Sequence, residues 1–129
     1  MGKIKNKVNA LLEKIKDDAD KTSLVRDMVD SCANYVDTVV NVENAINVYR
    51  FRVEDPSELR VMIQRLDQTR RIVHNTVISN VRIVDRLCKI NGVEPVFGGL
   101  DEDRLAIAEF AKKVVDEFFE DRKNKGGYY

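Results

Sequence analysis

The fold is decided at the stretch Asp55-Pro56-Ser57-Glu58, which carries the signals of a helix start. The Asp55 side chain can accept a hydrogen bond as the N-cap, Pro56 suits the first helical position, and Glu58 completes a capping-box pattern. Long segments of helical apolar periodicity lie on both sides of this stretch. We therefore expect a long antiparallel helical hairpin that turns at Asp55.

The segment before the turn, residues 23–54, has the clearest helical pattern. Its apolar residues advance in alternating steps of four and three, the spacing of a coiled-coil seam, through Met28, Cys32, Tyr35, Val39, Val42, Ile46, Tyr49 and Val53. A second apolar stripe consists of Val25, Val29, Val36 and Val40. A helix with two apolar stripes must be covered on two sides, so the pattern indicates a helical bundle.

The fold class that we predict is an all-α antiparallel bundle of four helices built on the long hairpin. The helices are expected near residues 3–20, 23–54, 56–91 and 101–122. Residues 1–122 then form one domain, and residues 123–129 form a mobile C-terminal tail because they lack apolar periodicity. The two shorter helices cannot cover the long ones completely, so we expect a homodimer in which a second copy covers the remainder.

The overall charge is balanced but unevenly distributed. Lysine plus arginine and aspartate plus glutamate number 22 each, so no net field attracts nucleic acid or anionic lipid. Segment 57–90 carries seven basic and three acidic residues, whereas segment 101–121 carries three and eight. We expect these helices to neutralise each other across the bundle. A nucleic-acid-binding face on segment 57–90 is the less favoured interpretation, because no aromatic residue interrupts its arginines.

The cysteines and the hydropathy narrow the class of protein further. Cys32 and Cys88 lie far apart in the expected hairpin, so we predict no disulfide. With one histidine and no CxxC pair, we expect neither a metal site nor a cofactor. No apolar run approaches the roughly 18 residues of a membrane span, so we expect no membrane partner. The thiols and the lack of a signal peptide favour the cytoplasm.

One polar spot interrupts the apolar face of the segment after the turn. At 100° per residue, Asp67, Arg70 and His74 follow one edge of that face. Position 70 lies opposite position 40 in the hairpin, so Glu43 can reach Arg70. We expect a buried Glu43–Arg70 ion pair that fixes the helix register. The alternative is a binding cleft formed by Glu43, Asp67, Arg70, His74 and Asn75.

The run Arg70-Arg71-Ile72-Val73-His74-Asn75 resembles the Arg…His motif of HEPN ribonucleases, which are helical bundles that act as dimers. The resemblance implies that Arg70 holds a phosphate and that His74 moves a proton or polarises the 2′-hydroxyl. Arg70 and His74 stand closer together than the two residues of that motif. A HEPN-like ribonuclease is therefore the alternative hypothesis and not the main one.

Two other resemblances concern different classes of helical protein. Glu117-x-x-Glu120 and Asp27-x-x-Asp30 are similar to the magnesium-binding pairs of helical nucleotide pyrophosphatases, but a chain with 34% charged residues produces such pairs by chance. The block from Leu66 to Asn75, continued by Asn80 and Leu87-Cys88, resembles short all-helical proteins of Gram-positive bacteria with no assigned function. The main hypothesis is a self-associating protein-interaction or regulatory module, and an enzyme is not favoured.

Overall fold

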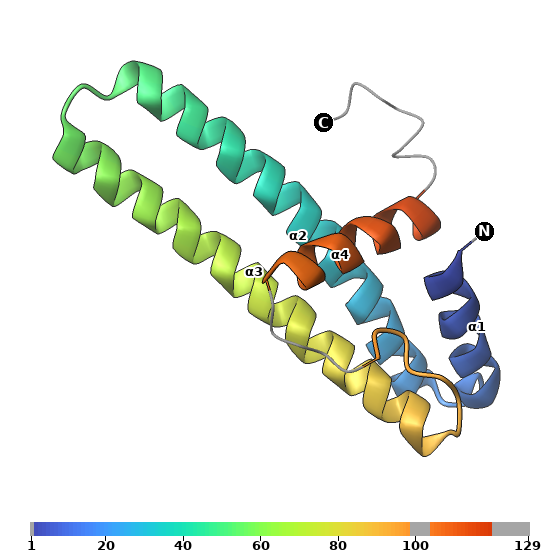
Figure 1. Cartoon of the computed structure of the whole chain (residues 1–129). Helices are drawn as coiled ribbons and strands as arrows, with labels where there is room; N and C mark the ends of the chain where they lie inside the picture. Colours follow the sequence, from blue (N-terminus) through green and yellow to red (C-terminus); the bar gives the residue numbers. More distant parts are fainter. Residues whose placement is uncertain (1, 99–103, 120–129) are drawn as a thin grey trace.

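A computed structural model of the chain describes residues 2–98 and 104–119. Its helices are α1 (Lys3–Ile15), α2 (Ala19–Arg52), α3 (Pro56–Ile90) and α4 (Arg104–Phe118). Figure 1 shows α2 and α3 as a long antiparallel hairpin, with α1 and α4 beside the end opposite its turn. The predicted all-α hairpin architecture is confirmed. The described part of the chain contains no helix with the length and apolarity needed to cross a membrane.

The turn between the long helices has the predicted N-cap at Asp55 and the predicted Pro56, but no hydrogen bond between the described residues Glu58 and Asp55 completes the capping box. The Asp55 carboxylate accepts a hydrogen bond from the Ser57 backbone N–H at 2.9 Å, and Pro56 is the first residue of α3. This arrangement satisfies one of the backbone donors that the start of a helix leaves without a partner. Asp55 therefore both ends the connection and starts the second half of the hairpin.

The predicted boundary between the first two helices is wrong. We expected the first helix to end near residue 20 and the second to begin at residue 23, whereas α1 ends at Ile15 and α2 begins at Ala19. The reason is that Asp18 is the N-cap of α2 and accepts hydrogen bonds from the backbone N–H groups of Asp20 and Lys21. At the other end of the chain, the predicted helical residues 101–103 and 120–122 and the tail 123–129 lie outside the described residues.

The hydrophobic core lies at the open end of the hairpin, where all four helices meet. Each helix contributes fully buried side chains, such as Leu11 from α1, Met28 from α2, Val81 from α3 and Ile107 from α4. Cys32 and Cys88 are both free cysteines that are buried in this core. Burial raises the pKa of the Cys32 thiol to about 12, because a thiolate is poorly solvated there.

The other half of the hairpin, residues 40–72, is a two-helix arm. Among the described residues of the arm, no apolar residue belongs to the core cluster or packs against it, and Val42 is the one buried apolar side chain. The other inward-facing residues are half-buried, and Phe51 and Ile72 remain 92% and 66% exposed. The arm therefore lacks the third layer that completes the core at the open end.

A single carboxylate holds the loop that follows α3. Asp85 Oδ1 accepts hydrogen bonds from the backbone N–H groups of Val96 at 2.8 Å and Phe97 at 3.1 Å, and its Oδ2 accepts one from Gly98 at 3.2 Å. The Phe97 ring then packs edge-on against Phe110 of α4, with ring centroids 5.1 Å apart. Asp85 thus joins the end of the hairpin to the helix that covers it.

We expect Asp85→Ala to lower the free energy of unfolding by about 2 kcal/mol, because three backbone donors lose their acceptor. Asp85→Asn keeps one acceptor oxygen and should lose less. Chemical denaturation measures both values, and Asp30→Ala, at an exposed position of α2, is the matched control. Equal stabilities for Asp85→Ala and Asp30→Ala would show that the carboxylate does not hold the loop.

Candidate functional site

A groove of about 570 Å³ runs along one face of the arm, between α2 and α3. We call it the arm groove. Its lining consists of Val39, Val42, Glu43 and Ile46 from α2 and Ile63, Gln64, Asp67, Gln68, Arg70 and Arg71 from α3. The four aliphatic residues give it an apolar floor, and the polar residues border that floor. Such a combination suits contact with another amphipathic helix.

The arm groove continues the face that the core covers at the open end. Cys32, Val39 and Ile46 follow one another at intervals of seven residues, which places them on one side of α2. Cys32 is fully buried in the core, and Val39 packs against the core cluster. Ile46, one heptad further along, is only half-buried. The same apolar stripe is therefore covered in its first half and left open in its second.

Arg70 is paired within its own helix. Its Nη2 forms an ion pair with Asp67 Oδ1, and Arg71 Nε lies 3.1 Å from the other carboxylate oxygen of Asp67. The expected Glu43–Arg70 ion pair is not formed, and Glu43 is exposed on the opposite border of the groove. The reason is proximity: on a helix, residues three or four apart are neighbours, so Asp67 meets both arginines without spanning the hairpin.

His74 is a packing residue at the base of the arm. Its ring lies 5.9 Å from the Tyr35 ring, centroid to centroid, and its Nδ1 is buried without a hydrogen-bond partner. Burial, and then the positive charge of Arg70, lower the pKa of His74 below its usual value of 6.5. The imidazole is therefore neutral at pH 7 and lies against an aromatic ring.

The structure brings together only part of the predicted site. Glu43, Asp67 and Arg70 line the arm groove, but His74 and Asn75 do not. The carboxylate pairs considered for magnesium give no centre, since the described residues contain no group of three or more potential metal ligands. Of those pairs, Glu120 lies outside the described residues, and Glu117 accepts a hydrogen bond from the Lys5 backbone N–H at 2.7 Å.

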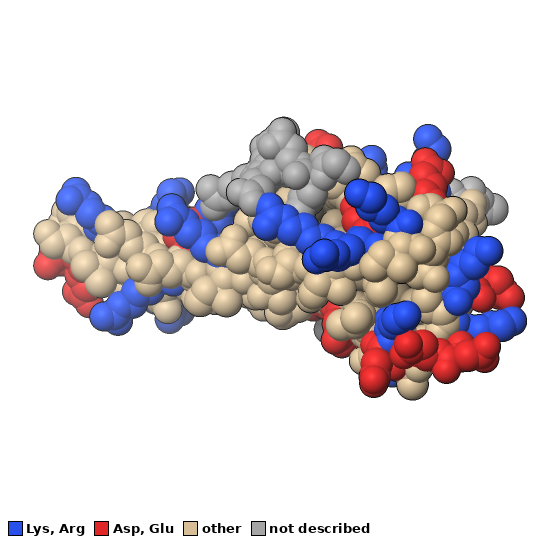
Figure 2. Space-filling view, turned by 90° about the horizontal axis from the view of Figure 1, so that it is seen from below, with Lys and Arg blue, Asp and Glu red and all other residues tan. Residues whose placement is uncertain are grey.

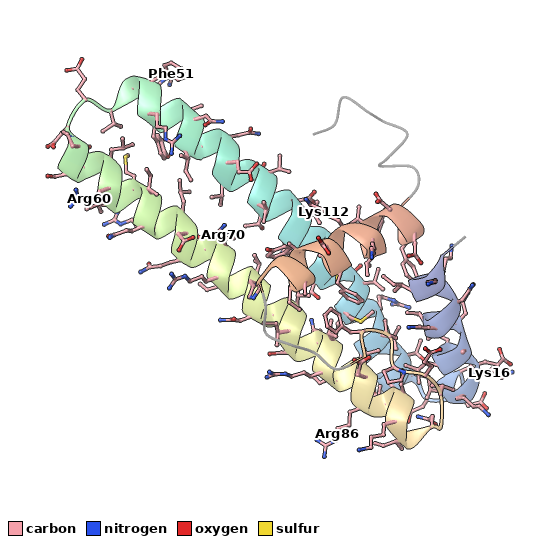
Figure 3. The ribbon with its side chains drawn as sticks, in the orientation of Figure 1. Lys16, Phe51, Arg60, Arg70, Arg86 and Lys112 are labelled. Carbon is pink, nitrogen blue, oxygen red and sulfur yellow. The ribbon has the colours of Figure 1, made fainter. Side chains whose placement is uncertain are left out.

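The tip of the arm was not predicted as part of a site. Phe51 is 92% exposed and has an arginine on each side, Arg50 and Arg52. Figure 3 shows Phe51 pointing away from α3, with Arg60 at the same end of the arm. Side chains of both charges gather at this tip in Figure 2. The signal was present in the sequence, because Phe51 stands off the heptad seam between Tyr49 and Val53.

We expect stability to fall as the pH drops below 6.5, the ordinary pKa of histidine, because unfolded His74 then takes up a proton that the folded ring resists. This loss of unfolding free energy should grow as the pH falls from 6.5 to the lowered pKa of the folded His74 ring. Above pH 6.5 the protein should lose no stability through His74. Urea denaturation from about pH 8 to about pH 5 measures this dependence. His74→Gln should flatten it, and an unchanged slope in the variant would assign the dependence to other groups.

The Arg70–Asp67 pair leads to a second expectation. The two side chains are 28% and 31% exposed and belong to one helix, so Arg70→Met should cost no more than about 1 kcal/mol. Methionine retains most of the apolar stem and removes the charge. Thermal and chemical denaturation measure the change. A loss of about 3 kcal/mol or more would indicate instead that a buried charge had been left without its partner.

The comparisons with known proteins identify a family and no activity. A family model described as "Protein of unknown function (DUF3232)" matches residues 2–124, nearly the whole chain. No curated protein matches the sequence.

Proposed function

The chain belongs to this family of proteins of unknown function, and we propose that it acts by association, as a homodimeric interaction or regulatory module. The observation that carries this proposal is the arm groove, whose apolar floor no described residue of the same chain covers. No comparable observation supports catalysis, since Arg70 is occupied by Asp67 and His74 lies against Tyr35. The HEPN-like ribonuclease is therefore not proposed further.

The energetics of helices support association through the arm. In water, helices gain most of their stability from packing an apolar face, and the arm has only two helices to share. Ile46 and Ile63 stay half-buried, and Val48 and Val61 are 44% and 46% exposed at the tip. A second arm laid on the groove supplies the missing layer. It converts two hairpins into a four-helix bundle, in which short-range packing resembles that of coiled coils.

A copy of the same chain fits the groove better than a polyanion does. The groove border carries Glu43 and Asp67 as well as Arg70 and Arg71, so it has no net charge to attract nucleic acid.

The proposal also includes the finer predictions from the sequence. These are a single domain over residues 1–122, a cytoplasmic location, coiled-coil-like packing and a bacterial origin like that of the Gram-positive proteins that the sequence resembles. A further protein partner is compatible with this module.

We expect the wild-type protein to show twice the 14.8 kDa mass of one chain by light scattering at micromolar concentration. Ile46→Glu should shift it to the monomer, because the substitution places a charge on the groove floor. Asn44→Glu adds the same charge at an exposed position that does not line the groove and should leave the dimer intact.

Circular dichroism of both variants distinguishes lost association from lost folding. Ile63→Glu, on the opposite helix of the groove, provides an independent repeat if Ile46→Glu fails to fold. A monomeric wild type at these concentrations would refute the proposal.

A further inference from the structure

The charges along the two helices of the arm change sign in a regular order. Near the tip, Arg50 of α2 and Arg60 of α3 are exposed basic residues. Seven residues away on each helix, and two turns closer to the core, lie the acidic Glu43 and Asp67. Seven residues return to the same side of a helix, so each helix presents a basic and an acidic position on one side. Ile46 and Ile63 lie between them.

We propose that the arm groove receives the arm of a second copy in one antiparallel register, with the twofold axis lying across both helices beside Ile46 and Ile63. This inference rests on the proposed self-association and adds its orientation and the residues that set it. A twofold axis perpendicular to the helices lays α2 on the partner's α2 and α3 on the partner's α3, each pair antiparallel.

The positions of the charges determine where the axis lies. Midway between Glu43 and Arg50 on α2, a twofold axis brings Arg50 beside the partner's Glu43, and the reverse pair forms by symmetry. On α3 the corresponding midpoint falls between Arg60 and Asp67. The two midpoints are at the same height in the hairpin, because Ile46 and Ile63, which adjoin them, both line the groove and lie about nine and about eight residues from the turn at Asp55. A single twofold axis therefore brings opposite charges together on both α2 and α3.

The length of the groove leads to the same axis. Packing against the core cluster ends at Val39 on α2, and the helix ends at Arg52, so the midpoint of the uncovered stretch lies next to Ile46. An antiparallel partner centred there covers each arm from its tip to the edge of the core. The acidic connection at Glu54 and Asp55 then lies close to the partner's Arg70 and Arg71, whose opposite charge favours this register.

Other arrangements set like charges against each other. In a parallel pairing α2 faces the partner's α3 at equal height, which places Arg50 against the partner's Arg60 and Glu43 against the partner's Asp67. Sliding the antiparallel partner by one heptad sets Glu43 against the partner's Glu43. Exposed charge pairs contribute little affinity but penalise wrong orientations, so they select the register while the apolar floor supplies the contact.

A charge exchange on α2 tests the register, with the dissociation constant of the dimer measured by sedimentation. Glu43→Arg and Arg50→Glu should each weaken the dimer about tenfold, because each creates two symmetry-related like-charge contacts. The double variant, Glu43→Arg with Arg50→Glu, should restore the wild-type constant. Arg52→Glu, a charge reversal at the same tip but two residues, or about 200°, around α2 from Arg50, is the matched control and should have little effect.

Each outcome supports or overturns the inference. In a parallel dimer both single variants would tighten association, because each would create an attractive contact with α3. If the double variant is as weak as the single ones, the pairing of Arg50 with the partner's Glu43 is wrong. A wild type that stays monomeric instead refutes self-association itself. As a second measurement, Gln64→Cys should form a disulfide-linked dimer, because position 64 lies beside the proposed axis.

Discussion

The structure depends on the unequal lengths of its helices. The two long ones have 34 and 35 residues and the two short ones 13 and 15, so at 1.5 Å per residue they extend about 50 Å and about 20 Å. Side chains from four helices can exclude water at one end of the hairpin and only those from two can do so at the other. The core at the open end and the groove on the arm both follow from this mismatch.

The charge pattern adds direction to a surface that apolar packing alone would leave ambiguous. A floor of aliphatic residues attracts any apolar helix, since the hydrophobic effect has no preferred orientation. Charged groups placed at intervals of two helical turns distinguish one orientation from another without contributing much affinity. A chain with equal numbers of acidic and basic residues can therefore still specify how it associates, through the order of its charges and not their sum.

The sequence predicted the elements whose determinants are local or periodic. The turn at Asp55 and the seam from Met28 to Val53 needed only cap chemistry and helical spacing. The start of α2 was misplaced because several acidic residues compete for one N-cap, and only the backbone conformation at Asp18 selects between them.

The candidate site was predicted in part, for a similar reason. Glu43, Asp67 and Arg70, which we expected near one another, all line the arm groove, but helical angles could not determine that Arg70 pairs with a neighbour on its own helix. The Asp85 contacts with the loop join residues 11 to 13 positions apart and follow no period. Apolar periodicity identifies the residues that will be buried. Phe51 is informative because it is exposed to solvent, so this pattern did not identify it.

The position of the turn has a consequence for how the chain folds. Contacts near Asp55 join residues close in sequence, whereas Met28 and Val81 belong to one core and lie about 50 residues apart in the chain. Forming the core without the arm therefore requires a large loss of chain entropy. Progressive pairing of α2 with α3 from the turn shortens the loop of chain that must still be closed to form the core. The arm, which buries least, therefore assists the core by reducing the entropy of closure and not by direct contact.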